Sequence, residues 1–469
     1  MPADQRAPKA PLAIGLASLT FVGLLVASPA VAEIKTITAT GEYRMGDNDT
    51  RTDAKRLALL DAKRHALEQV TIYLVGDTEI RDFGLSHDEI RAYTAGIVQV
   101  VELSASFSQE GATTVARIDV TVKIDSDVVV RQIEALRQNE IVREEVRTLG
   151  HELGRLKDEV DQKSTEIATA QSKVEHDRLM QQKVLLLEKA ETDGLLLQAW
   201  LALGGGGPTS TFTPGKTTAE GREAALQLVE RALTQDSSYP RTYVLKGIIL
   251  IEEQDYHEAA ETCRRAINLL PSLARGHDCL GVALARKGDR RGAVAAYREA
   301  VRLSPSDANF HLKFAGALYL SRKFDEAIRE FREAIRLKPD DISARRGLGL
   351  AYVTVEEWAK AETHLRKALQ HNPNDAMVRS AQGVVLWKMG KLDEAEIELS
   401  EAIRLDPHYA DGHNNLGFFL HKKGDYDQAI VHYQEALRIH PAHPYASVNL
   451  PNAIRDKESK RTAGSETVK

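Results

Sequence analysis

Six evenly spaced prolines in the C-terminal half of the chain constrain its fold more than any other feature. Each interval between neighbouring prolines is 34 residues, and the prolines are Pro271, Pro305, Pro339, Pro373, Pro407 and Pro441. A fixed period of this length indicates an array of identical supersecondary units that bury their apolar faces against one another. In such an array we expect function to reside on an extended surface and not in one catalytic pocket.

The residues around each proline define the repeating unit. Two apolar runs of helical spacing precede the proline, with turn residues such as Lys287-Gly288-Asp289 between them. Small Gly and Ala residues let the two helices approach closely, a large residue at the Tyr297 position fills the space between them, and proline ends the second helix. Each unit is therefore predicted to be helix, turn, helix. The signature before Pro441 is Leu416, Gly417, Leu420, Ala429, Tyr433 and Ala436.

This signature resembles the tetratricopeptide repeat (TPR), and six in-register units over residues 238–441 carry the resemblance. The resemblance implies a mainly α-helical solenoid. A degenerate seventh unit with a Gly-rich insertion loop is predicted over residues 191–237, with its first helix at 195–203. One consensus position, usually a large aromatic residue, departs from the pattern, and we expect this to weaken individual units; it holds Tyr243, His277, His311, Arg345, Arg379 and His413.

Solvent-facing capping helices close arrays of this type. We predict such a helix over residues 442–456, where Pro444 suits the first turn but Pro451 would kink or shorten the helix. The polar residues 457–469 are predicted to be a disordered tail.

The N-terminus has the pattern of a secretory signal. Arg6 and Lys9 precede an apolar run over residues 12–27, and Ala30-Val31-Ala32 follows. We predict that residues 1–32 are a signal peptide cleaved after Ala32, which places the chain in a bacterial periplasm without a transmembrane span. The alternative is an inner-membrane anchor through residues 12–27.

Residues 33–130 are predicted to form a small α/β domain. A strand over 34–43, a helix over 53–70 and two alternating strands joined at Glu110-Gly111 indicate an antiparallel sheet covered on one side by a helix. Val101, Leu103, Ala105 and Phe107 are expected on its apolar face. Ala39-Thr40-Gly41 and the Ala-rich helix resemble the N-terminal domain of flagellar assembly protein T and lipoprotein-20 domains, which are exported envelope domains.

Apolar residues from Val142 to Val174 follow the alternating four- and three-residue steps of a heptad pattern. This predicts a coiled coil over residues 131–190, through which the chain could form homo-oligomers. The alternative is a long helix folded back on the N-terminal domain. An exported coiled coil followed by TPRs is similar in layout to the periplasmic coordinator proteins that work with the Tol-Pal system.

The sequence contains no convincing catalytic, cofactor or metal site. Pro214-Gly215-Lys216-Thr217 lacks the upstream glycine of a phosphate loop, and the spaced aspartates near Asp49 lack the glycine and glutamate of a calcium loop. A net charge of −6 gives no strong attraction to nucleic acid. Cys263 and Cys279 could pair in an oxidising compartment, but two free buried thiols are the favoured interpretation.

The TPR resemblance implies a partner-binding groove lined by residues two, five, nine, twelve and thirteen of each unit. These positions form a largely apolar stripe with basic neighbours, and large aromatic residues facing a groove are typical binding anchors. Units that grip a C-terminal carboxylate carry Gly-Asn at positions eight and nine, and that pair is absent here. The candidate groove residues are Ile248, Val282, Tyr319, Leu350, Val384, Trp387, Phe418, Arg275, Arg346, Lys388 and Lys422.

These patterns together predict a non-enzymatic, exported scaffold that binds a protein or peptide partner in the groove of its TPR array. In the alternative, the N-terminal domain docks to an envelope or flagellar assembly or binds a ligand, and the repeats serve as a spacer.

Overall fold

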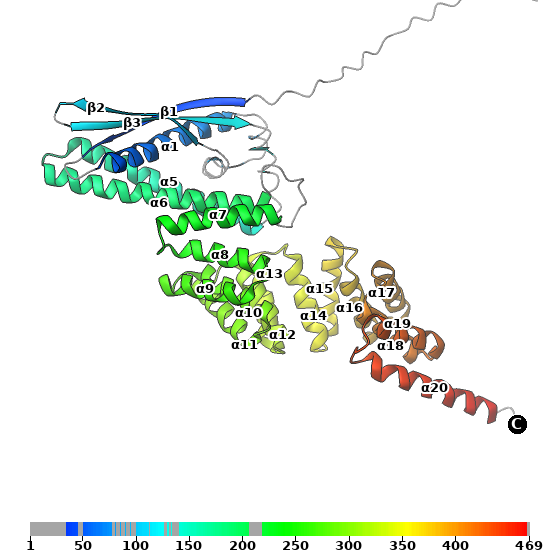
Figure 1. Cartoon of the computed structure of the whole chain (residues 1–469). Coiled ribbons are helices and arrows are strands. Elements are labelled where there is room, and N and C mark those ends of the chain that lie inside the picture. Colours follow the sequence, from blue (N-terminus) through cyan, green and yellow to red (C-terminus); the bar gives the residue numbers. More distant parts are fainter. Residues whose placement is uncertain are drawn as a thin grey trace, which may run out of the picture.

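The computed structural model shows a small sheet domain, a helical hairpin and a long helical array in chain order (Figure 1). It describes residues 34–45, 50–76, 100–111, 113–125, 140–205 and 218–466, together with residues 80, 85, 90, 94, 129, 130 and 133. The predicted signal peptide and residues 206–217 of the insertion loop lie outside the described residues. Within the described part of the chain, the helices are all too short or too polar to cross a membrane.

The sheet has three antiparallel strands in the order β1-β3-β2, and helix α1 covers one of its faces (Figure 1). The strands are β1 (Ile34–Arg44), β2 (Val100–Glu110) and β3 (Thr113–Asp125), and α1 spans Arg51–Gly76. Alternate β3 residues from Ala116 to Ile124 are buried against α1. A side chain at Gly41 would collide with the backbone of Ala62, so the glycine lets β1 lie directly on α1. The predicted sheet-and-helix arrangement is confirmed.

One detail of the predicted sheet is wrong. The register of β2 shifts between Glu102 and Ser104 because of a β-bulge. The alternation of inward and outward side chains is therefore reversed before the bulge relative to after it. Val101 therefore pairs with Thr121 on the polar outer face and is 60% exposed. Phe107, beyond the bulge, keeps the predicted inward direction opposite Ala116.

The heptad pattern forms a helical hairpin within the chain, not the predicted coiled coil. Helix α5 (Glu140–Thr169) ends at a break over residues 170–172, and α6 (Lys173–Gly205) packs back along it. The seam residues Val142, Val146 and Leu149 are buried in the core of the sheet domain, while Val160 packs on Leu57 of α1. The apolar seam thus packs against other elements of the same chain. This arrangement resembles the alternative prediction, in which a long helix folds back on the N-terminal domain.

One hydrophobic core runs from the sheet through the hairpin into the first TPR. It joins Ala39 of β1, Val146 of α5, Trp200 of α6, Val229 of α7 (Ala219–Gln235) and Ile249 of α8 (Pro240–Glu252). The predicted boundaries at residues 130 and 190 therefore do not separate independent cores. The C-terminal part of α6 and all of α7 pack as the predicted degenerate unit.

The array continues as pairs of antiparallel helices. The first helices of the six units are α8, α10 (Ala274–Lys287), α12 (Ala308–Leu320), α14 (Ile342–Thr354), α16 (Ala376–Lys388) and α18 (Ala410–Lys423). The second helices are α9 (Tyr256–Leu269), α11 (Arg290–Leu303), α13 (Phe324–Leu337), α15 (Trp358–His371), α17 (Leu392–Leu405) and α19 (Tyr426–Ile439). The predicted mainly α solenoid with a small antiparallel sheet is confirmed.

The residues that depart from the aromatic consensus stand at position four when each unit is counted from the first residue of its first helix, and they serve a common structural purpose. Each donates a hydrogen bond to the carbonyl oxygen six residues earlier, which in five of the six cases belongs to the repeat's proline. In His311, for example, Nε2 lies 3.0 Å from Pro305 O, and in Arg379 Nε lies 2.7 Å from Pro373 O. These hydrogen bonds therefore tie each first helix to the preceding turn. The sequence-based expectation that these residues weaken their units did not take this contact into account.

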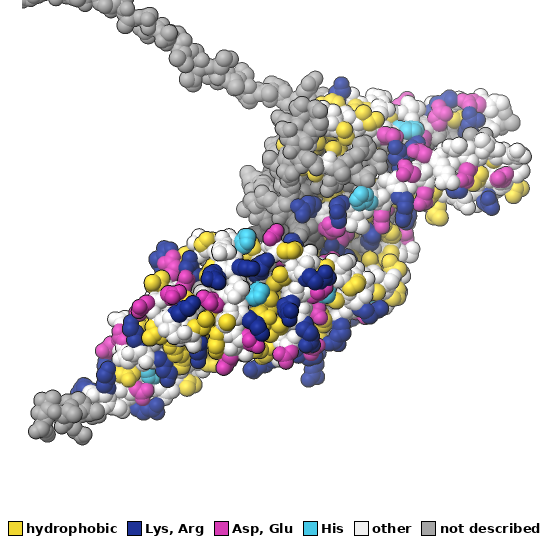
Figure 2. All heavy atoms as spheres, turned by 180° about the vertical axis from the view of Figure 1, so that it is seen from behind, with side chains coloured by type: hydrophobic (Ala, Val, Ile, Leu, Met, Phe, Trp, Pro, Cys, Tyr) yellow, Lys and Arg dark blue, Asp and Glu magenta, His cyan; other side chains and the backbone are white. Residues whose placement is uncertain are grey.

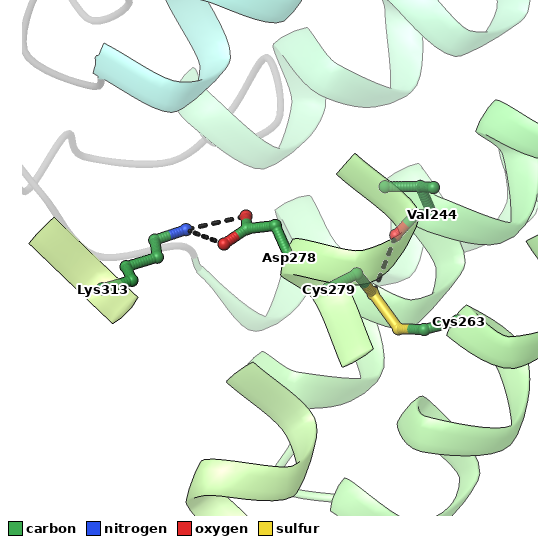
Figure 3. The surroundings of a disulfide bond; sticks show 5 residues. All are labelled: Val244, Cys263, Asp278, Cys279 and Lys313. Atoms are coloured by element: carbon green, nitrogen blue, oxygen red, sulfur yellow. Dashed lines mark hydrogen bonds and ion pairs between the residues drawn. A yellow bond between two sulfur atoms is a disulfide. The ribbon is translucent and has the colours of Figure 1, made fainter. Parts of the chain in front are cut away.

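Cys263 and Cys279 form a disulfide, so the favoured interpretation of two free thiols is wrong (Figure 3). The bond joins α9 to α10, the second helix of one unit to the first helix of the next. Its Cα atoms are 5.8 Å apart. Gly247 makes room for the bond, because a side chain there would lie against both sulfur atoms.

The C-terminal cap is longer than predicted. Helix α20 (Ala446–Glu466) packs on α19 and α18 and continues through ten residues that we expected to be disordered. Lys457 bonds to Asp427, and Lys460 lies 5.3 Å from the Tyr426 ring. These contacts with α19 hold the polar segment in helical form beyond Pro451.

Candidate partner-binding groove

The candidate groove is a stripe of positions two, five, nine, twelve and thirteen on the first helices, which lie side by side through the array. Polar bonds between side chains 35 residues apart join neighbouring first helices along this stripe. Lys313 Nζ is 2.8 Å from both carboxylate oxygens of Asp278 (Figure 3), and Asn415 donates to Ser380 at 3.1 Å. Some groove positions are therefore used to hold the array together and are not free for a partner.

Helix α5 covers the N-terminal end of the groove. Glu145 Oε1 lies 2.7 Å from Arg275 Nε, and Glu152 Oε1 lies 2.8 Å from Arg241 Nη2. Burial acts to lower the pKa of the Arg275 guanidinium, but the carboxylates of Glu145 and nearby aspartates outweigh it and raise that pKa. Arg275, predicted as a partner-binding residue, is thus paired within the chain.

A cavity of about 320 Å³ separates the hairpin from the first repeats. Thr148, Leu149 and Trp200 line it from the hairpin, and Val244 and Phe310 line it from the array. Charged contacts at the cavity's rim therefore supplement the shared hydrophobic core in joining the hairpin to the array at this end.

A second polar contact anchors the hairpin beside the cavity. Tyr239, directly before α8, donates a 2.5 Å hydrogen bond to Asp193 of α6. Burial raises the pKa of the Asp193 carboxyl to about 6, although the Tyr239 hydrogen bond opposes this. The contact lies next to the Glu152–Arg241 pair, so both act on the same junction.

The C-terminal part of the groove has the same kind of cations without carboxylate partners. Trp387 and Phe418 meet edge to face with their ring centroids 5.5 Å apart, and both rings are partly buried. Lys388 Nζ lies 4.8 Å from the centroid of the Trp387 ring, and Lys422 Nζ lies 5.3 Å from that of Phe418. Among the described residues, neither lysine has a salt bridge.

The remaining predicted residues are spread along the stripe. Tyr319 contacts Phe324 and is 3.1 Å from Thr354 Oγ1 of the next first helix, so it is partly used between repeats. Arg346 is half exposed, with Nη1 at 3.5 Å from Asp375 Oδ2. The four aliphatic residues are partly buried and pack on the array's cores: Ile248, Val282, Leu350 and Val384.

The sequence reasoning missed the carboxylates that cover the N-terminal end. Glu145 and Glu152 belong to a series of glutamates seven residues apart that continues with Glu159 and Glu166. This period was a usable signal, because residues seven apart lie on one face of a helix. The charges around the heptad seam are equally typical of a coiled coil, so the period alone does not distinguish the two arrangements.

No constellation of catalytic or metal-binding side chains is found in the described part of the chain, where no three His, Cys, Asp or Glu residues are placed to hold a metal ion. The histidines at position four pack locally, and His413 Nδ1 lies 3.1 Å from His432 Nδ1. Acidic, basic and apolar side chains are interspersed over the face of the array in Figure 2. The array therefore offers a surface for recognition.

Comparison with known proteins agrees with this geometry. Models of the tetratricopeptide repeat match residues 240–272, 280–342, 318–385 and 410–443, and a TPR repeat model matches 388–424. They do not confirm the resemblance of the N-terminal domain to flagellar assembly protein T. No curated protein matched the chain.

Several solved structures are similar to part of the chain. YrrB, described as a TPR protein with an unusual peptide-binding site, is 26% identical over 40% of this chain and 96% of its own, with a TM-score of 0.34. PilF of Pseudomonas aeruginosa is 20% identical over 46% and 96%, with a TM-score of 0.40. MamA is 24% identical over 35% and 95%, with a TM-score of 0.31.

The 34-residue period, the paired helices and the family models all coincide over the same residues, 240–443. The fold supports a role in protein–protein interaction. Residues 240–443 of the chain form tetratricopeptide repeats.

Proposed function

We propose that this protein is an exported cell-envelope scaffold that binds a protein partner in the C-terminal part of its TPR groove. One observation carries the proposal: the Trp387–Phe418 pair is only partly buried and is flanked by two lysines that lack carboxylate partners among the described residues. Aromatic anchors beside charged groups are typical of binding hot spots.

Two features support export to an oxidising compartment. The N-terminus carries the charge, apolar and small-residue pattern of a secretory signal, and the disulfide between Cys263 and Cys279 suits a periplasm better than a cytosol. Cell fractionation and the mass of the mature chain test this proposal. We expect a periplasmic protein that begins at Glu33, whereas an anchored chain would retain residues 12–27 in the membrane fraction.

The groove proposal is tested by replacing both aromatic anchors, Trp387→Ala and Phe418→Ala, in the full chain. Capture of partners by crosslinking in the intact envelope, read by mass spectrometry, should fall by about tenfold or more. Leu392→Ala is the matched control, because Leu392 is an exposed apolar residue of a second helix. Unchanged capture with an unchanged helical CD signal would contradict the groove assignment.

The alternative, in which the N-terminal domain docks to the envelope machine, has weaker support. The polar face of its sheet is internally bonded: Thr40 and Ser104 donate to Asp119, and Arg117 pairs with Glu42. This domain also shares its core with the hairpin, so truncation at residue 130 would expose apolar surface. Capture that survives the double aromatic substitution but is lost on Arg117→Ala would favour the alternative.

A further inference from the structure

Helix α5 already pairs with two cations of the chain's own groove, and this pairing indicates what kind of segment the groove accepts. Two carboxylates of α5, Glu145 and Glu152, contact Arg275 and Arg241, which occupy position two of adjacent repeats. The inference that follows rests on the proposed function and specifies the chemistry of the partner.

The spacing of these charges has a simple physical basis. Seven residues of an α-helix rise about 10.5 Å, which is close to the roughly 8–10 Å between the axes of packed helices. A helix that crosses the first helices can therefore present one carboxylate to each repeat. Glu145 contacts the second repeat and Glu152 the first, so α5 runs antiparallel to the array.

The residues between the two carboxylates face the array across the cavity. Thr148 and Leu149 stand three and four positions after Glu145, on the same side of the helix. Both line the cavity opposite Val244 and Phe310 of the array. Helix α5 thus carries carboxylates at positions i and i+7, Glu145 and Glu152, and cavity-facing residues at i+3 and i+4, Thr148 and Leu149.

The C-terminal part of the groove repeats the basic half of this arrangement. Lys388 and Lys422 occupy position thirteen of adjacent repeats, as Arg241 and Arg275 occupy position two. Positions two and thirteen lie on the same face of a first helix, about three turns apart. The Trp387–Phe418 pair lies between the two lysines. At the N-terminal end of the groove, the corresponding place beside the two arginines is the cavity.

We propose that Lys388 and Lys422 bind an amphipathic helix of a partner protein that carries two carboxylates seven residues apart. Its third and fourth residues after the first carboxylate contact the rings of Trp387 and Phe418. The lysines keep their cation–π contacts and donate to the carboxylates, which replaces water at a partly buried surface. The partner helix crosses the first helices at position thirteen, about three helical turns from position two, where α5 pairs with the arginines.

Three fluorescent peptides test the proposal against the full chain, each of about 20 residues and held helical by a side-chain bridge on its rear face, since free helices of this length are marginal. The first has Glu at i and i+7 with Leu at i+3 and i+4. The second has the same composition with Glu at i and i+5, and the third has Lys in place of both Glu. By anisotropy, the first should bind at least about tenfold tighter than either of the others.

Charge reversal then locates the site. Lys388→Glu with Lys422→Glu should reverse the preference, so that the Lys peptide becomes the tighter ligand. Arg336→Gln is the matched control, because Arg336 is a basic residue of a second helix that already pairs with Glu333. Equal binding of the three peptides, no binding, or loss of binding on Arg241→Gln alone would overturn the inference.

These outcomes are distinguishable from failure of the proposed function. If the peptides do not discriminate but envelope capture still depends on Trp387 and Phe418, the groove binds partners of another chemistry. If capture does not depend on these rings, the proposed function itself fails.

Discussion

The two ends of the TPR array carry basic residues in the same repeated pattern but use them differently. At the N-terminal end, Arg241 and Arg275 are paired with carboxylates of α5, and a disulfide joins α9 to α10. At the C-terminal end, Lys388 and Lys422 lie over aromatic rings and form no salt bridge among the described residues. The difference teaches that cations on one groove face can serve different ends: those at the N-terminal end stabilise the fold because the chain supplies their partners, and we propose that those at the C-terminal end serve recognition.

The largest expected effect comes from the disulfide, which exists only at the N-terminal end. Cys263→Ala with Cys279→Ala should lower local stability around α9 and α10 by about 3 kcal/mol, since the bond spans a sequence separation of 16 and removes the loop-closure entropy of that segment from the unfolded chain. Hydrogen exchange should show this loss in α9 and α10 and little change in α18 and α19, because repeats interact mainly with their neighbours. Equal loss throughout the array would remove the distinction between its ends.

The charged contacts of α5 come next. Glu145→Gln should destabilise the junction of hairpin and array by about 2 kcal/mol, because it leaves the mostly buried Arg275 without its partner. Glu396→Gln is the matched change at the C-terminal end, where the partner Lys423 is exposed, and it should cost less than about 0.5 kcal/mol. Hydrogen exchange of α5 measures the first effect. Similar protection in both variants would show that α5 is held by other contacts.

Opposite responses to pH should separate the third repeat from the sixth. The hydrogen bond to Glu330 raises the pKa of His311, so its contribution is complete below the unfolded value of about 6.5 and is lost as pH rises through the folded pKa. Burial, followed by the charge of His413, lowers the pKa of His432, so its contribution is present above about 6.5 and is lost as pH falls.

Hydrogen exchange at two pH values, corrected for intrinsic rates, tests this contrast. Acidification should favour α12 and α13 and disfavour α18 and α19, by roughly 1 kcal/mol in each direction. His311→Gln should remove the response of the third repeat, and His432→Gln that of the sixth. A response of the same sign in both repeats would refute the assignment of charge states.

The smallest expected effect concerns the groove lysines. Lys388→Gln and Lys422→Gln should change the free energy of unfolding of their repeats by less than about 0.5 kcal/mol, since exposed residues without strong partners contribute little to stability. Arg275→Gln should cost clearly more, for the reason given for Glu145. Hydrogen exchange of the second, fifth and sixth repeats provides the measurement for the three variants. A large loss for either lysine would assign it a structural role.

The repeats were predictable because each unit is built from local patterns. Proline at a fixed interval, small residues where helices approach and a large residue between them are all read along the chain. The hydrogen bonds from position four to the preceding carbonyl were not predicted, although both partners stand six residues apart. His311 and Arg379 were judged by similarity to an aromatic consensus, and their donor groups were not considered.

The errors share a physical cause, which is that contacts distant in sequence decided the outcome. The apolar seam of a heptad pattern can pack against another chain or against the same chain. Here the seam of α5 packs into the core of the sheet domain of the same chain. A single bulge turned Val101 to the outer face of the sheet. Contacts with α19 kept residues 457–466 helical, although their composition alone suggested disorder.

The sequence by itself determined the kind of molecule: a 34-residue helical repeat with an apolar groove stripe, because period and side-chain size act within each unit and its neighbours. Only the tertiary structure decided which part of that groove is occupied, because occupation depends on α5 reaching Arg241 and Arg275 from about a hundred residues away. The cations at one end are paired within the fold, and we propose that the cations at the other end bind a partner.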